Sequence, residues 1–167
     1  GCKYLIVPGL GGDYSGSKEN WLKAADAFNT IAAALKPEGM WTGYHNHTHE
    51  FIPLESGELP WDVLFGNTSK DVCMQFDTGN AMHAQAEATT FLERYPGRAR
   101  TIHCKSYAAD NPDAMIGEDD VPWPRVIELC ETIGNTEWYI IEQESYPYPP
   151  LECAERCLNN LKEILGR

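Results

Sequence analysis

Val72-Cys73-Met74-Gln75-Phe76-Asp77-Thr78-Gly79-Asn80 is the stretch of sequence that decides the fold. Its apolar residues indicate a buried strand, and the Asp77-Thr78-Gly79-Asn80 end is typical of a turn that leaves a strand. A helical pattern over residues 86–95 follows and stops at Pro96-Gly97. Because a strand that is apolar on both faces has to be covered on both, this unit predicts a parallel sheet covered by helices.

The same strand–helix unit recurs before and after this stretch. The other apolar runs predict strands over 4–8, 41–47, 100–104 and 138–141. Helical patterns begin near residue 18, where Ser17 is a suitable N-cap and Pro37 and Gly39 end the helix, and recur over 59–65, 124–133 and 151–165. Strands and helices alternate without a linker, so we expect an α/β fold in which residues 1–167 form one domain.

The composition is that of an ordinary globular protein. The chain has 167 residues, of which 43% are hydrophobic and 23% are charged, and its formal net charge is −12. This acidic balance disfavours nucleic acids and anionic membrane surfaces as partners. The apolar runs are far shorter than the ~20 residues of a membrane helix.

The cysteines and the start of the chain predict a cytoplasmic location. No charged leader followed by an apolar segment is visible. The six cysteines include no CxxC pair, and Cys73 and Cys104 lie in apolar runs where cysteine behaves as a small hydrophobe. We therefore expect reduced thiols rather than a disulfide framework.

Polar residues follow four consecutive predicted strands at the point where each strand ends. These groups are His45-Asn46-His47-Thr48-His49-Glu50, then Gln75 with Asp77, then His103 with Lys105, then Glu142-Gln143-Glu144. Because the carboxyl ends of parallel strands share one edge, where parallel α/β folds place their sites, we expect these side chains to lie near one another.

Carboxylates combined with imidazoles are the ligands that Mn²⁺, Co²⁺, Mg²⁺ or Zn²⁺ prefer. Such an ion polarises a carbonyl and stabilises an adjacent enediolate, while a neighbouring carboxylate or imidazole moves the proton. Two or three carboxylates and one imidazole from these strand ends would form such a site.

Each group also has a purely structural interpretation. His103 fits a core histidine, Asp77 fits a helix cap, and Glu142 with Glu144 fits a solvated strand end. The histidine-rich group is harder to explain structurally, because alternation places His45 and His47 on one strand face and burying two imidazoles without partners is costly. Lys105 either holds a substrate oxygen, pairs with a carboxylate of the site or is simply exposed at a strand end.

Four motifs together resemble the sugar phosphate isomerase/epimerase family of xylose isomerase-like barrels. They are Tyr44-His45-Asn46-His47 with Glu50-Phe51, Gln75 to Asn80, Ile102-His103-Cys104-Lys105, and Trp138 to Glu144. That group also includes ketose 3-epimerases, inosose dehydratase and endonuclease IV. The resemblance covers nearly the whole chain and implies a (β/α)8 TIM barrel with a divalent metal, commonly Mn²⁺.

The resemblance also implies roles for individual residues. The metal ligands would be Glu50, Asp77, His103 and Glu142, although His45 or His47 is an alternative to Glu50, and Glu144 to Glu142. Glu50, Glu142 and His47 would be catalytic. His45, Lys105, Gln75 and Glu144 would bind substrate. Ser106 replaces the aspartate that usually follows the family's lysine.

The chain is short for this fold. A complete barrel has about 250 residues, and the motifs correspond to strands four to eight, so we expect a barrel truncated to about five βα units. The resemblance favours a metal-dependent isomerase or epimerase acting on a sugar or keto-sugar. The alternatives are an incomplete barrel that binds metal or self-associates through exposed sheet edges, and an endonuclease IV-like DNA repair enzyme, which the net charge disfavours.

Overall fold

The computed structural model describes residues 1–167 and contains five parallel strands in one curved sheet, in the order β1-β2-β3-β4-β5. Their bounds are β1 Tyr4–Val7, β2 Trp41–His45, β3 Val72–Asp77, β4 Thr101–Lys105 and β5 Trp138–Glu142. Spatial order equals chain order, so each parallel connection crosses over the sheet through a covering segment. The predicted α/β fold of about five βα units is confirmed: the sheet is a half-barrel.

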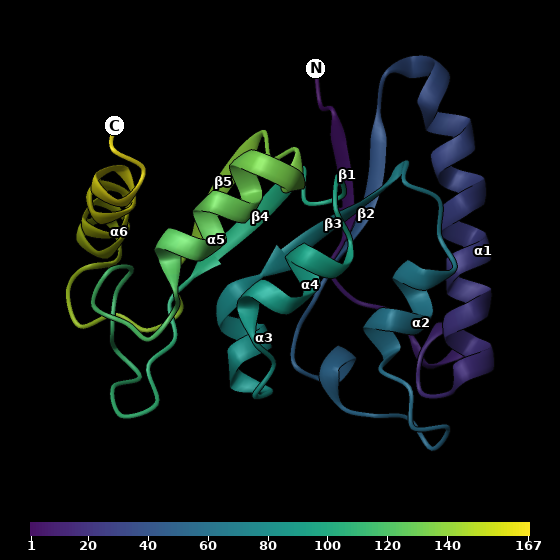
Figure 1. The fold of residues 1–167 in the computed structure, drawn as a ribbon, viewed down its shortest axis with the longest axis horizontal. Helices are drawn as coiled ribbons and strands as arrows, with labels where there is room; N and C mark the ends of the chain where they lie inside the picture. Colours follow the sequence, from purple (N-terminus) through teal and green to yellow (C-terminus); the bar gives the residue numbers. More distant parts are fainter.

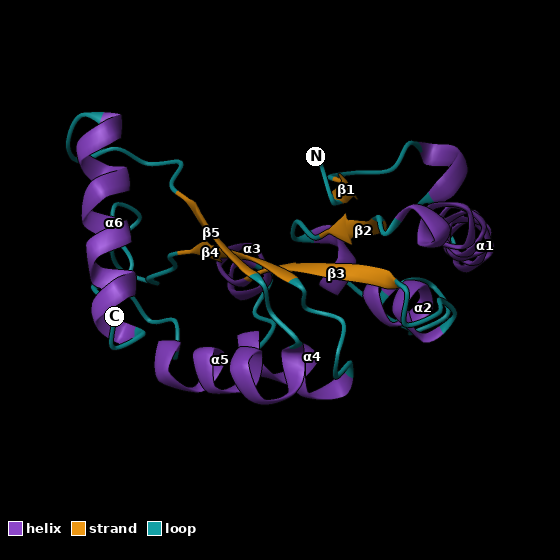
Figure 2. Cartoon of the chain, turned by 90° about the horizontal axis from the view of Figure 1, so that it is seen from above, coloured by secondary structure: helices purple, strands orange, loops and turns teal.

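The major helices lie along the outside of the arc that the strands describe (Figures 1 and 2). The helices are α1 Lys18–Leu35, α2 Pro60–Gly66, α3 Thr78–His83, α4 Ala88–Arg94, α5 Trp123–Leu129 and α6 Pro150–Ile164. Short 3-10 turns span Gly12–Tyr14, Lys36–Glu38 and His49–Phe51, and a π-helical turn spans Cys130–Gly134. As predicted, Ser17 caps α1, its side chain accepting a hydrogen bond from the Asn20 amide at 3.2 Å.

Strand alternation decides which side chains of β2 reach the inside of the half-barrel. Tyr44 points to the outer side, where its ring packs edge-on against Trp21 and Phe28 of α1. Its neighbour His45 therefore points to the inner side. Gly43 also matters here, because a Cβ at this position would lie 2.3 Å from the Cys73 carbonyl oxygen. The close approach of β2 and β3 thus depends on glycine.

Two differences from the sequence prediction lie next to the candidate site. β2 ends at His45, not at residue 47, and the short helix α3 begins immediately after β3. The cause of the second difference is Asp77, whose Oδ1 accepts a hydrogen bond from the Asn80 amide at 2.6 Å and caps α3. Asp77 therefore ends a strand and starts a helix.

The two edge strands, β1 and β5, have no further strand beside them. Leu5 in β1 is 46% exposed and Trp138 in β5 is 59% exposed. A cavity of about 470 Å³ lies between these strands and includes Tyr4 and Ile140 in its lining.

None of the helices is long and apolar enough to cross a lipid bilayer.

Candidate metal and active site

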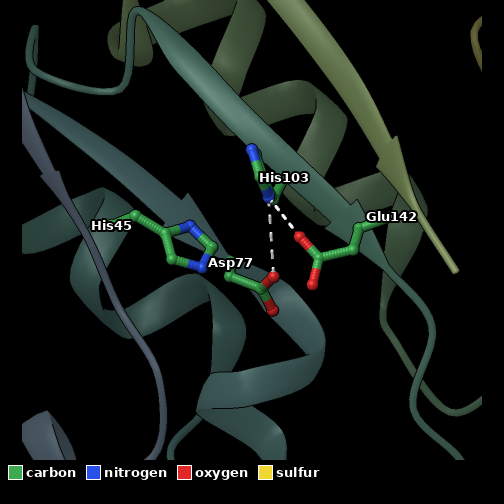
Figure 3. Close-up of side chains that lie close together, drawn as sticks. All are labelled: His45, Asp77, His103 and Glu142. Carbon is green, nitrogen blue, oxygen red and sulfur yellow. Dashed lines mark hydrogen bonds and ion pairs between the residues drawn. The ribbon is translucent and has the colours of Figure 1, made fainter. Parts of the chain in front are cut away.

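Four ligand-type side chains from four consecutive strands meet at the carboxyl end of the half-barrel (Figure 3). They are His45 at the end of β2, Asp77 at the end of β3, His103 in β4 and Glu142 at the end of β5. One ligand atom from each residue lies within 4.8 Å of the others. The structure thus brings together three of the four predicted ligands, Asp77, His103 and Glu142, and adds His45.

The donor set of this cluster fits a divalent cation. His103 Nδ1 lies 2.5 Å from Glu142 Oε2 and 3.9 Å from Asp77 Oδ2. Asp77 Oδ2 and His45 Nδ1 are buried and have no hydrogen-bond partner. Because unpaired polar atoms are costly to bury, two such atoms on the side chains of one cluster fit a site that takes up an ion. Two imidazoles and two carboxylates suit Mn²⁺, Co²⁺ or Zn²⁺.

The local electrostatics set the protonation of these groups. Burial, together with the charge of His103, lowers the pKa of His45 to about 4, so this imidazole is neutral at pH 7. Burial raises the pKa of Asp77 to about 7. The hydrogen bond with His103 and the nearby Lys105 ammonium lower the pKa of Glu142 to about 2. A neutral imidazole and an ionised carboxylate are the forms that bind metals.

Glu50 lies apart from the cluster, so its predicted ligand role does not agree with this geometry. Its side chain is fully buried, and its oxygens accept hydrogen bonds from Tyr44 Oη at 2.6 Å and from the His47 amide at 2.9 Å. Since Tyr44 points to the outer side of β2, the Glu50 carboxylate is held there too. The imidazole of His45, the alternative left open by the sequence, takes the fourth position.

Lys105 connects the cluster to the rim. Its Nζ donates to Asn80 Oδ1 at 2.9 Å and to Glu142 Oε1 at 3.2 Å, and also pairs with Glu144. Burial alone would lower the pKa of Lys105, but these carboxylates raise it above its usual value. Lys105, Glu142 and Glu144 line a polar cavity of about 230 Å³.

Two further predicted site residues lie on either side of the cluster along the barrel axis, His47 towards the rim and Gln75 towards the interior. His47 is exposed, and its ring centroid is 5.1 Å from that of His45. Gln75 lies deeper in the half-barrel, where its amide donates to Thr101 Oγ1 at 3.0 Å and where it lines the concave cavity. The position of His47 suits contact with a substrate, whereas Gln75 is turned away from the rim.

A model of the xylose isomerase-like TIM barrel family matches residues 1–164. The chain belongs to this family. The resemblance stated from the sequence is therefore confirmed at the level of family and fold.

The curated relatives that the chain resembles are longer than the chain. Inosose dehydratase of Serratia proteamaculans (strain 568) is 26% identical over 174 residues, a match that covers 90% of this chain and 57% of that protein. Inosose dehydratase of Clostridium beijerinckii (strain ATCC 51743 / NCIMB 8052) is 22% identical, with 97% and 60% covered. The chain thus spans about three-fifths of the length of these curated relatives.

Solved structures show the same fold. A sugar phosphate isomerase/epimerase from Parabacteroides distasonis ATCC 8503 superposes with a TM-score of 0.82 at 19% identity, covering 97% of this chain and 58% of the other. A D-psicose 3-epimerase superposes with a TM-score of 0.66 at 10% identity, covering 99% and 65%.

Sequence reasoning missed two buried asparagines beside the cluster, Asn46 and Asn80. The Asn46 side chain accepts from the backbone amide of Asp77 and donates to its backbone carbonyl, and the backbone N–H of Asn80 donates to the Asp77 carboxylate. The sequence held one hint of their importance: Asn46 is adjacent to His45, an alternative ligand, and Asn80 lies three residues after Asp77. Their hydrogen bonds, however, depend on three-dimensional packing that residue spacing does not reveal.

Proposed function

We propose that the chain carries the metal site of an enzyme that moves a proton next to the carbonyl of a sugar or keto-polyol. The observation that supports this most is the convergence of His45, Asp77, His103 and Glu142, with two buried donor atoms left unpaired. These four residues would hold the divalent ion, for which we propose Mn²⁺.

The names of the relatives agree with this chemistry. Epimerisation of a keto-sugar and dehydration of an inosose both begin with removal of a proton from the carbon beside a carbonyl. Epimerisation then returns a proton to the opposite face, whereas dehydration expels a hydroxyl group. We propose an isomerase or epimerase reaction, with the dehydratase reaction as the alternative outcome of the same first step.

The position of each residue at the site suggests its role in the proposed reaction. A bound divalent ion would supply Lewis-acid polarisation of the carbonyl and stabilise negative charge beside it. Glu142 and the exposed His47 are the proposed proton carriers. Lys105 and Glu144, which face the polar cavity, would orient substrate hydroxyl groups. Glu50 has no such role in this proposal, since it is not one of the clustered residues and its oxygens accept hydrogen bonds from Tyr44 and the His47 amide.

Metal binding is the first test. Mn²⁺ titration should give about one ion per chain for the wild type, and Glu142→Gln and His103→Ala should each abolish uptake because each removes a ligand. Glu155→Gln, which changes an exposed carboxylate of α6, is the control and should bind like the wild type. Unchanged Mn²⁺ affinity in both ligand variants would contradict the proposal.

Proton transfer is the second test. The Mn²⁺-loaded chain is incubated in D₂O with inosose and with ketohexoses, and proton NMR follows deuterium entering the carbon beside the carbonyl. A new epimer signal identifies epimerisation, and a vinylic signal identifies dehydration. Metal uptake without exchange on any substrate would instead favour the alternative, a metal-binding partial barrel without turnover.

A further inference from the structure

The carboxyl ends of β2 and β3 are joined by a side chain where the backbone ladder stops. The backbone register of β2 and β3 ends at the pair His45 and Gln75. Beyond it, Asn46 Oδ1 accepts from the Asp77 amide at 2.8 Å, and Asn46 Nδ2 donates to the Asp77 carbonyl at 3.0 Å. The amide of Asn46 thus replaces the next backbone pair and fixes Asp77 against β2.

Asn80 connects Asn46 to Lys105 at the end of β4. Its Nδ2 donates to the Asn46 carbonyl at 3.1 Å, and its Oδ1 accepts from Lys105 Nζ at 2.9 Å. Both asparagines are buried, with 0% of Asn46 and 7% of Asn80 exposed. The hydrogen bonds therefore run without solvent from the end of β2 to the end of β4.

The same network selects one oxygen of each carboxylate. Asp77 Oδ1 is engaged by the Asn80 amide, which leaves Oδ2 unpaired within the cluster. Glu142 Oε1 is engaged by Lys105, which leaves Oε2 beside His103. Lys105 reaches this position by crossing Gly79, where a Cβ would lie 2.7 Å from Lys105 Cγ.

We propose that Asn46 and Asn80 are positioning residues of the metal site. Asn46 holds the backbone of Asp77 against β2, while the backbone amide of residue 80 occupies Oδ1 and leaves Oδ2 for the ion. The Asn80 side chain holds Lys105, so that Glu142 offers Oε2. This inference rests on the metal site of the proposed function and assigns work to two residues that are not ligands. Partners of this kind commonly change metal affinity by about ten- to a hundredfold.

The test is a Co²⁺ titration followed by visible absorption, which reports both affinity and ligand geometry. Asn46→Ala removes both bonds to the Asp77 backbone and should raise the Co²⁺ dissociation constant by about ten- to a hundredfold. Asn80→Ala leaves the residue 80 amide on Asp77 Oδ1 and releases only Lys105 and the Asn46 carbonyl. We expect a smaller rise, about threefold or more, and an altered Co²⁺ spectrum.

Asn29→Ala is a matched control. Asn29 also bridges a backbone donor and a backbone acceptor, accepting from the Ser69 amide at 2.7 Å and donating to the Asn67 carbonyl at 3.0 Å, but it lies away from the site. It should bind Co²⁺ like the wild type. Amide hydrogen exchange adds a metal-free readout, since exchange at Asp77 should accelerate in Asn46→Ala and remain slow in Asn29→Ala.

The outcomes separate this inference from the proposed function. Equal Co²⁺ affinity and spectra in the wild type and in both folded asparagine variants would overturn the positioning role alone. Absence of Co²⁺ uptake by the wild type would overturn the proposed metal site and this inference with it. If circular dichroism shows that Asn46→Ala is unfolded, the test rests on Asn80→Ala. An unchanged Co²⁺ dissociation constant and an unchanged spectrum in Asn80→Ala would then refute the inference.

Discussion

His45 and Glu50 are separated by five positions in the sequence, yet their functional atoms lie on different sides of β2. His45 follows the inner parity of the strand, whereas Glu50 returns to the outer side and binds the hydroxyl group of Tyr44. Side-chain parity in β2 thus brings His45 into the cluster, whereas Glu50 lies in the turn His49–Phe51, after the strand has ended, and is held by Tyr44 and the His47 amide.

A first prediction concerns Tyr44→Phe. The change removes a hydrogen bond to a fully buried carboxylate, so we expect a loss of about 1–3 kcal/mol in the free energy of unfolding. Urea denaturation measures this loss. Mn²⁺ uptake by the folded variant should equal that of the wild type, because Glu50 is not one of the four clustered residues.

Glu50→Gln is the complementary variant for this prediction. It retains a side chain of the same size beside Tyr44 and removes only the charge and one acceptor oxygen. Loss of Mn²⁺ binding in a folded Glu50→Gln chain would return Glu50 to the ligand set and contradict the assignment of His45.

Much of the candidate site could be predicted from residue types at strand ends. Asp77, His103 and Glu142 were expected as ligands and meet in the cluster, whereas His45 was expected to bind substrate or, as an alternative to Glu50, to be a ligand. The sequence could not decide which residue near the end of β2 joins the cluster. The strand ends at His45, because the Asn46 side chain then takes the place of the backbone pairing with β3. That replacement depends on the neighbouring strand.

At the level of elements, the strands and long helices follow directly from apolar patterning, and α3 does not. Helix α3 has six residues, too few to establish a helical period, and includes Gly79, which disfavours a helix. It forms because Asp77 caps it and its residues pack against β4. Local propensity is overridden by tertiary contacts here.

The contact between β2 and β3 gives a second prediction. Gly43→Ala places a Cβ 2.3 Å from a backbone oxygen that cannot rotate away, so we expect a loss of about 1–3 kcal/mol or more in the free energy of unfolding. Gly66→Ala is the control, because nothing lies within 4 Å of a Cβ there. Equal urea midpoints for both variants would show that the strands can separate at little cost.

The connection between β4 and α5 gives a third prediction, on pH. Burial raises the pKa of Asp119 to about 6, while its carboxylate accepts from Trp123 Nε1 at 2.7 Å and from the Gly117 amide at 3.2 Å. The unfolded chain releases this proton near pH 3.9, so the folded state binds more protons between about pH 4 and 6. Asp119 therefore lowers the free energy of unfolding as pH rises through this window.

Asp119→Asn should remove that contribution and make the fall in stability between about pH 4 and 6 shallower. Urea titrations at several pH values measure the slope. Asp113→Asn, which changes an exposed carboxylate of the same connection, is the control. A slope in Asp119→Asn that is identical to that of the wild type would show that this carboxyl does not titrate between the two states.

For the whole molecule, the number and order of βα units could be predicted because each unit has its own apolar strand and stop signals. The exposed edges follow from the truncation to about five units, whereas the curvature of the sheet could not be predicted, because it arises from the sum of many strand twists. Leu5 and Trp138 occupy these edge strands, which have no neighbour on one side, and both side chains are exposed.

These edges give a fourth prediction. Unpaired strand edges with exposed apolar side chains favour association, so the isolated chain should form larger species as its concentration rises. Size-exclusion chromatography with light scattering measures this, and the double variant Leu5→Lys with Trp138→Lys should remain monomeric. Leu151→Lys, at an 87% exposed position on α6, is the control. A wild-type monomer at every concentration would contradict the prediction.

The four clustered side chains belong to strands that are consecutive in the chain, from residue 45 to residue 142. An ion shared by them would act as a cross-link between four βα units. Its binding would then be linked to folding, and free metal at a hundredfold above its dissociation constant would add about 2.7 kcal/mol to the free energy of unfolding. Metal binding would thereby add to the stability of this half-barrel as a whole.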